Sequence, residues 1–204
     1  RGKAYFELLD AFVEAVSRRW PRAIVQWEDF AKENAFTVLD RYRDRVPSFN
    51  DDILGTGAVV LSALRNALEI ARVPLSEARI LFLGAGEACI GSGRAIKAAK
   101  VAAGCAPQQA AESMAFLDTQ GLVVEGREGL ESFKREVAMP DRLAWTTTAP
   151  DRVLPEAIDH FRPHAVVAAT GVAGIFTEES VKAMAALNAR PILFALSNPS
   201  ALTE

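Results

Sequence analysis

The feature that most constrains the fold is the regular alternation of short apolar segments with helical segments between residues 79 and 195. Runs such as A-V-V-A-A (165–169) and I-L-F-A-L (192–196) are apolar at every position, which is typical of strands buried on both faces. Strands that alternate with helices form a parallel sheet with helices on both sides. The sequence therefore predicts an α/β fold with a doubly wound parallel sheet.

The spacing of apolar residues also predicts where the individual elements lie. An amphipathic helix is expected around residues 6–16, before a strand at 23–27, and further helices at 28–45 and 56–72. Beyond these, the predicted strands are 79–83, 114–117, 142–146, 165–169 and 192–195, and the predicted helices are 88–103, 154–161 and 178–187, with a short helix in the glycine-punctuated loop after residue 117.

Composition narrows the functional classes. Of the 204 residues, 50% are hydrophobic and 24% are charged, and the net charge is −3, as in an ordinary soluble globular protein. No uninterrupted apolar run approaches the roughly 18 residues of a membrane helix. Basic residues are spread along the chain beside acidic ones, so neither a membrane nor a nucleic acid is expected as a partner. Two cysteines indicate a reducing, cytoplasmic compartment, and small molecules are the expected partners.

The ends of the chain predict a piece of a larger protein. The first residue is Arg1 rather than Met, and the opening segment lacks the apolar core of a signal peptide. The last residue, Glu204, follows shortly after a predicted strand. We therefore expect truncation at both ends.

A glycine-rich turn after the 79–83 strand is a candidate nucleotide-binding feature. Gly84 and Gly86 lie between this apolar strand and a predicted helix. In a dinucleotide-binding fold, the first glycine permits the tight turn and the second permits close approach of the pyrophosphate to the helix N-terminus. The third position of the fingerprint is Cys89, with Gly91 two residues further on. The fingerprint is therefore imperfect, while its strand, turn and helix context is right.

Asp118, at the end of the 114–117 strand, is the candidate acid for the adenine ribose. It lies further from the turn than the usual spacing of about 20 residues, because a loop at 104–109 intervenes. An acid at this place favours NAD over NADP. Arg127, Lys134 and Arg135 follow and could meet a 2′-phosphate, so NADP stays open, and a solvated surface is an equally good interpretation of these cations. In the plainest alternative, the glycines only form a tight turn and Asp118 caps a loop.

Two acidic pairs form a candidate metal site. Glu28-Asp29 follows the 23–27 strand, and Asp51-Asp52 precedes the helix that begins near Thr56. The carboxyl ends of strands and the N-termini of helices face the ligand crevice of an α/β fold, so both pairs are expected to converge there. A divalent cation that prefers oxygen, such as Mg²⁺ or Mn²⁺, would offset their repulsion. On these residues alone, capping of helix N-termini is the alternative.

At this point the sequence resembles the malic enzymes. The matching segments occur in the family's order and cover essentially the whole chain. They are V-Q-W-E-D-F-A (25–31), N-A (34–35), R-Y-R (41–43), S-F-N-D-D-I-x-G-T (48–56), the turn at Gly84, R-P-I (190–192) and L-S-N-P (196–199). The combination of F-N-D-D-I-x-G-T with an upstream Q-x-E-D-F is far more specific than the glycine turn.

The resemblance implies a role for each candidate residue. Glu28, Asp29 and Asp52 would hold Mn²⁺ or Mg²⁺, which also binds the hydroxyl and carboxylate of the substrate, and Asp51 would orient the general base. The cofactor would lie with its pyrophosphate at the glycine turn and its adenine ribose at the end of the next strand. The implied cofactor contacts are Thr56, Gly84, Ala85, Gly86, Glu87, Asp118, Thr170, Gly171 and Asn198.

The resemblance also implies an activity and a domain organisation. Residues 1–46 would be the C-terminal part of the substrate- and metal-binding domain, and residues 47–204 an incomplete Rossmann-type NAD-binding domain. The implied activity is oxidative decarboxylation of malate to pyruvate and CO₂ with reduction of NAD, dependent on a divalent metal. Malic enzymes are commonly dimers or tetramers, so the full-length enzyme is expected to be a homo-oligomer.

Departures from the family pattern leave alternatives open. Leu54 stands where malic enzymes usually carry glutamine. The family's tyrosine acid, its lysine base and a substrate-binding arginine lie upstream of the matched region, and a second substrate asparagine lies downstream. The 204 residues alone are therefore not expected to turn over malate. The alternatives are a malolactic enzyme, which uses NAD and Mn²⁺ to make lactate directly, and a non-catalytic NAD-binding module.

Overall fold

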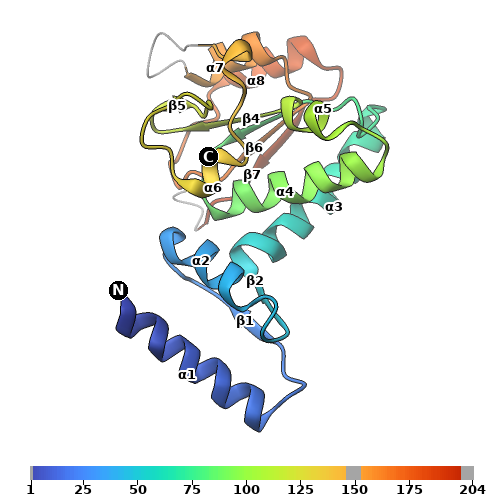
Figure 1. The fold of residues 1–204 in the computed structure, drawn as a ribbon. Coiled ribbons are helices and arrows are strands. Elements are labelled where there is room, and N and C mark those ends of the chain that lie inside the picture. The colour runs from blue at the N-terminus through green and yellow to red at the C-terminus, as the bar shows by residue number, and fades with distance from the viewer. Residues whose placement is uncertain (1, 146–152, 199–204) are drawn as a thin grey trace.

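The apolar runs from residue 80 onward form one five-stranded sheet (Figure 1). The structure is a computed structural model that describes residues 2–145 and 153–198. Strand order is β5-β4-β3-β6-β7, in which β5 is antiparallel to β4 and the other pairs are parallel. The strands are β3 (Ile80–Leu83), β4 (Met114–Asp118), β5 (Gly121–Leu122), β6 (Ala165–Ala168) and β7 (Ile192–Ala195). The prediction of a doubly wound α/β fold is confirmed.

Burial on both faces explains why the strands are apolar at every position. Ile80 and Phe82 of β3 contribute to a core cluster with the helices on one face, and Phe82 stacks on Phe116 of β4 with ring centroids 4.3 Å apart. Leu81 and Leu83 contribute to a second cluster on the opposite face. Buried residues of these clusters come, among other helices, from α3 (Thr56–Ala71) and α4 (Glu87–Ala102) on the first face and from α7 (Val153–Phe161) and α8 (Glu178–Leu187) on the second.

The longest apolar helix of the structure does not appear in the sequence as an uninterrupted apolar run. A π-helical turn, η1 (Asp51–Gly55), continues directly into α3, and together they form a largely apolar helical stretch of 21 residues. Its length and composition would suffice to cross a membrane. Val60, Leu64 and Leu68 of α3 are nevertheless buried in the core cluster of the first face. One such helix is weak evidence for a membrane, since core helices of soluble folds have the same composition.

A smaller N-terminal lobe precedes the sheet and contains α1 (Lys3–Arg19), β1 (Val25–Trp27), α2 (Lys32–Tyr42) and β2 (Ser48–Asn50). Strands β1 and β2 form a separate parallel pair, and β2 was not predicted as a strand. Helix α1 is held through Val13, which is buried with Trp27 and Tyr42, and through Asp10. The Asp10 carboxylate accepts hydrogen bonds from the side chains of Arg41, Tyr42 and Arg45.

The strand predicted at 142–146 is wrong over the residues described. Asp141–Leu143 is a 3₁₀ helix, η2, and Thr146 lies outside the described residues. Trp145 stacks on Phe161 of α7 with ring centroids 5.6 Å apart, while Leu143 stays 38% exposed. In this segment Trp145 therefore packs against a helix, and Leu143 is partly exposed to solvent. The segment has the composition of a strand but not its structure.

Two other boundaries differ from expectation. The region around the predicted loop at 104–109 contains a helix, α5 (Pro107–Glu112), which begins with proline at its first position, where the missing N–H costs nothing. The helix predicted at 28–45 begins only at Lys32. The short helix expected after β4 is present as α6 (Ser132–Arg135). The division of the chain between residues 46 and 47 stays a prediction, and β1 pairs with β2 across it.

Candidate metal and nucleotide site

The pairing of β1 with β2 brings the two acidic motifs together. The strands run parallel with Trp27 opposite Asn50, so the residues that follow both strands leave at the same end. One carboxylate oxygen from each of Glu28, Asp29 and Asp52 lies within 4.8 Å of the others. Residues that are 24 positions apart in sequence thus form one cluster, as the sequence predicted for these three side chains.

The backbone at Asp29 fixes the geometry of this cluster. Its φ of 55° is left-handed, a conformation that aspartate tolerates better than most residues. The turn directs the Asp29 N–H to Asp52 Oδ2 at 3.1 Å, and Gln26 Nε2 donates to Glu28 Oε2 at 2.6 Å. An unusual backbone conformation persists only where its surroundings hold it, so the carboxylates are arranged before any ligand binds.

The cluster fits a divalent cation. Among the residues that the structure describes, no lysine or arginine forms an ion pair with Glu28, Asp29 or Asp52. The negative potential reaches Glu87, whose pKa is raised to about 7 by burial and then by the charges of Asp52 and Asp29. Three carboxylates without a counter-charge match the oxygen donor set that Mg²⁺ and Mn²⁺ prefer.

Asp51 lies beside the cluster in sequence and is not one of the three residues within it. Its side chain folds over the turn of η1, where a Cβ on Gly55 would overlap Asp51 Oδ1. Leu54, in the same turn, is 40% exposed. The proximity of Asp51 to the cluster follows from its place at the start of η1, and its role in orienting a base stays a prediction.

The glycine turn lies where the topology of the sheet places a ligand crevice. Neighbouring strands β3 and β6 connect onward in opposite directions, and ligands of open α/β sheets bind beyond the carboxyl ends of such a pair. Gly84 has a φ of 101°, and a Cβ there would lie 2.6 Å from the Ala169 oxygen. Gly86 precedes α4 and has no atom within 4 Å of the Cβ position. Open space in front of an uncapped helix N-terminus fits a pyrophosphate.

One hollow of about 680 Å³ extends from Asp29 and Asp52 of the acidic cluster to the start of α4, directly after this turn. It is lined from both sides, by acidic residues of the N-terminal lobe and η1 and by residues that follow the strands of the sheet. The predicted site residues in its lining are Asp29, Asp52, Thr56, Glu87, Gly171 and Asn198. The predicted residues outside its lining are Glu28, Asp51, Gly84, Ala85, Gly86, Asp118 and Thr170.

Ser197 is a lining residue that the sequence analysis did not single out. Its hydroxyl accepts a hydrogen bond of 2.9 Å from the Gly171 N–H, which ties the turn after β7 to the turn after β6. Thr170 Oγ1 accepts from the Val172 N–H at 3.1 Å and shapes the same turn. Ser197 stood next to Asn198 in the L-S-N-P motif, so the motif contained the signal.

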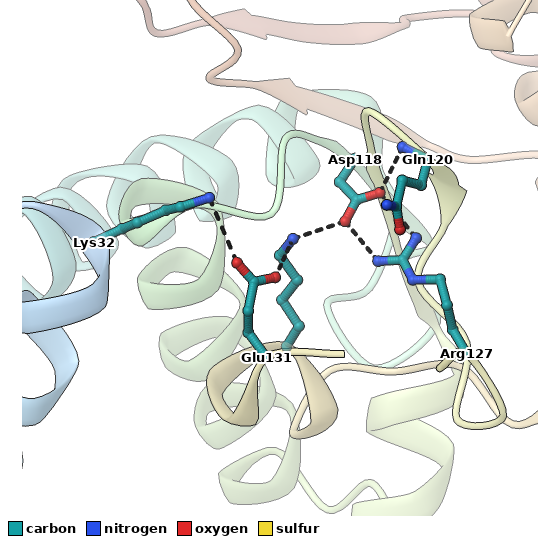
Figure 2. A network of polar contacts seen from close by, with 6 residues as sticks. Lys32, Asp118, Gln120, Arg127 and Glu131 are labelled. Atoms are coloured by element: carbon teal, nitrogen blue, oxygen red, sulfur yellow. Dashed lines mark hydrogen bonds and ion pairs between the residues drawn. The ribbon is translucent and has the colours of Figure 1, made fainter. Parts of the chain in front are cut away.

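Asp118 lies at the carboxyl end of β4 as predicted, but its carboxylate is already occupied (Figure 2). Arg127 donates two hydrogen bonds to it, at 2.9 and 2.5 Å, Lys134 donates one at 2.8 Å, and the Gln120 N–H donates one at 2.9 Å. Burial alone would raise the pKa of Asp118, but the hydrogen bonds from Arg127, Lys134 and Gln120 lower it to about 2. Two of the three cations considered for a 2′-phosphate, Arg127 and Lys134, are thus partners of the acid considered for the ribose.

Comparisons with known proteins show the family of the chain. Residues 53–204 match the family model described as malic enzyme, NAD binding domain, and residues 1–43 match malic enzyme, N-terminal domain. A curated NAD-dependent malic enzyme of Shewanella frigidimarina is 42% identical over 100% of this chain, and the chain spans 36% of that relative's length.

Solved structures show the same relationship. The malic enzyme of Entamoeba histolytica has a TM-score of 0.74 and 26% identity, over 93% of this chain and 37% of that one. An NAD-dependent malic enzyme from Thermotoga maritima shares the fold, with a TM-score of 0.67 at 21% identity, over 93% of this chain and 46% of that one. With most of its length matched by the family's own domain model, the chain belongs to the malic enzyme family.

Proposed function

We propose that this chain supplies the metal site and much of the NAD site of an enzyme that oxidatively decarboxylates malate to pyruvate and CO₂. The observation that carries the proposal is the single hollow lined by Asp29 and Asp52 on one side and by Glu87, Gly171 and Asn198 on the other. A metal-held 2-hydroxy acid and a nicotinamide ring would meet there. Curated relatives named NAD-dependent malic enzyme support the same activity.

In this proposal the residues of the chain bind and orient the reactants. A bound Mn²⁺ or Mg²⁺ would supply Lewis-acid polarisation of the substrate oxygen in both oxidation and decarboxylation. Glu28, Asp29 and Asp52 would hold the cation, and the hydrogen bond from the Asp29 N–H keeps Asp52 turned towards it. Asp51 would orient the general base. Proximity in a fixed arrangement is a large part of what such a site contributes to catalysis.

The nucleotide would extend from the hollow along the carboxyl ends of β3 and β4. The pyrophosphate would lie at 84–87, with the N–H groups at the start of α4 as donors. Thr56, Thr170 and Asn198 would complete the nicotinamide end. We propose NAD as the cofactor, on the acid at the end of β4 and the names of the relatives, with a homo-oligomeric, cytoplasmic enzyme as the setting.

The metal site is tested most directly by Mn²⁺ binding to the Asp52→Asn variant. We expect the affinity to fall at least about tenfold, because loss of a ligand costs more than loss of the outer contacts that already contribute ~10–100-fold. Titration calorimetry of the intact protein gives the dissociation constant. Asp44→Asn, which removes an exposed carboxylate elsewhere in the N-terminal lobe, is the matched control and should bind like the wild type.

Two results would contradict the proposal. Equal Mn²⁺ affinity in the wild type and Asp52→Asn would contradict the proposed metal site. Absence of NAD binding by the wild type would contradict the proposed nucleotide site. Analysis of the product of malate turnover by the full-length protein, pyruvate or lactate, tests the reaction itself.

A further inference from the structure

Lys134 has two carboxylate partners at the candidate ribose position. Its Nζ lies 2.8 Å from Asp118 Oδ2 and 2.6 Å from Glu131 Oε2, and its side chain is only 11% exposed. Glu131, the residue before α6, also pairs with Lys32 at the start of α2, 3.6 Å away (Figure 2). Lys134 is therefore held between two acids, and one of these acids is shared with a second lysine.

The position of α6 is fixed independently of these charges. Phe133, next to Lys134, stacks on Phe36 of α2 with ring centroids 4.6 Å apart and an interplanar angle of 12°. Arg94 of α4 pairs with Glu136 at 2.9 Å, just after α6. These contacts keep the helix in place, so the choice of partner by Lys134 is a local matter between Asp118 and Glu131.

Asp118 has no spare capacity for a nucleotide hydroxyl. An ionised carboxylate offers about four lone-pair positions, and four donated hydrogen bonds already reach Asp118. A ribose 2′-hydroxyl that donates to Asp118 must replace one of these donors. Lys134 is the donor that can leave at least cost, because Glu131 is already within hydrogen-bonding distance and keeps the ammonium paired.

A 2′-phosphate meets the opposite situation. It would need Arg127 and Lys134 as counter-charges, yet Arg127 forms a two-bond pair with Asp118, and Lys134 is neutralised from two sides. Binding would break these pairs and place the phosphate next to the Asp118 carboxylate. Glu131 thus assists a 2′-hydroxyl and opposes a 2′-phosphate.

We propose that Glu131 is a specificity-determining residue that selects NAD over NADP by holding Lys134. This inference rests on the proposed function, since it takes the end of β4 as the adenine ribose position. Glu131 acts through Lys134 and Asp118 and is a positioning residue. Lys32 weakens the effect of Glu131, because it pairs with the same Glu131 carboxylate as Lys134.

The test is the ratio of the dissociation constants of NADP and NAD, measured by titration calorimetry on the intact protein with Mn²⁺ present. Glu131→Gln is expected to weaken NAD binding, strengthen NADP binding and shift the ratio about five- to tenfold towards NADP, the size expected for the net contribution of one ordinary hydrogen bond. Lys32→Gln should shift the ratio towards NAD, because Glu131 then pairs with Lys134 alone. A general loss of stability would weaken both nucleotides alike and leave the ratio unchanged.

Glu128→Gln is the matched control, because it removes the same charge from an exposed position three residues earlier. Its ratio should equal that of the wild type. An unchanged ratio in Glu131→Gln would overturn the inference while leaving the proposed function intact. Absence of NAD binding by the wild type would overturn both, and Mn²⁺ binding measured in parallel would show that the protein is folded.

Discussion

At the scale of single residues, backbone conformation contributes as much to the candidate site as side-chain chemistry. The sequence points to Asp29 because of its carboxylate. In the structure, the left-handed φ of this residue also turns the chain after β1 and directs its own N–H at Asp52. The same turn delays the start of α2 to Lys32. Periodicity carries no information on such a turn, because one residue outside a helix or strand leaves no repeat. The acid was therefore predictable, and its geometry was not.

Asp118 leads to a prediction for the pH dependence of stability. Its pKa in the folded protein is about 2, compared with 3.8 for the ordinary group. Because the folded pKa is lowered, the stabilisation is fully present above about pH 4 and is lost as pH falls through about 2, with a contribution of about 2 kcal/mol. Urea unfolding between pH 5 and 2 measures it. Asp118→Asn should flatten this part of the profile, and an unchanged profile would contradict the ion-pair assignment.

At the scale of elements, the helix after the glycine turn does more than present its N-terminus. Gly91 of α4 faces η1, where a Cβ would overlap the Ile53 oxygen, and a Cβ on Gly57 of α3 would lie 2.8 Å from the Gly91 oxygen. Gly93 faces the ring of Phe116 in β4. Gly91, which lies two residues beyond the third position of the fingerprint, and Gly93 therefore permit close contact of α4 with the helical stretch that carries Asp52 and with the sheet.

Two glycine variants separate these roles. Gly91→Ala is expected to lower the free energy of unfolding by about 2–3 kcal/mol, since the methyl group meets backbone that cannot move away. Gly86→Ala has open space and an ordinary φ of −94°, so its stability should stay within about 0.5 kcal/mol of the wild type, while NAD binding weakens. Urea unfolding and NAD titration of both variants check this pair. Equal stability losses would refute the packing role assigned to Gly91.

At the scale of the whole molecule, α2 of the N-terminal lobe also packs into the core of the sheet. Phe36 and Leu39 of α2 are buried in the same cluster as Phe82 and Phe116 of the sheet. The acidic cluster draws its residues from the N-terminal lobe and from η1, so a bound cation would connect the lobe to the helix that covers the sheet. Metal binding is therefore expected to affect the stability of the whole fold.

Thermal unfolding with and without Mn²⁺ tests this expectation. At 100 times its dissociation constant, a ligand of the native state adds about 2.7 kcal/mol, which raises the Tm of a chain of this size by about 5–10 °C. Asp52→Asn should lose at least about half of this increase, as a tenfold weaker affinity requires, and its metal-free Tm should not fall, because the substitution removes one of three repelling charges. An equal rise in Tm for the variant and the wild type would show that the cation binds elsewhere.

The helices and strands differ in how far the sequence could predict them. The strands β3, β4, β6 and β7 were predictable because burial on both faces requires an apolar residue at every position. Strand β2 and η1 were not, since three residues and a π-turn are too short to show a period. The segment at 142–145 shared the apolar composition of a strand, and only its packing on α7 shows the difference.

Residue types and their local order were enough to predict the fold class, the family and the three acidic residues of the cluster. Only the packing of the elements shows which acidic side chains already have a cationic partner and which do not. Asp118 is bonded to Arg127 and Lys134, which lie 9 and 16 residues further along the chain, while Glu28, Asp29 and Asp52 have no cation of their own among the residues described. Charge partners across such separations follow from how the elements pack, and no local pattern in the sequence encodes that packing.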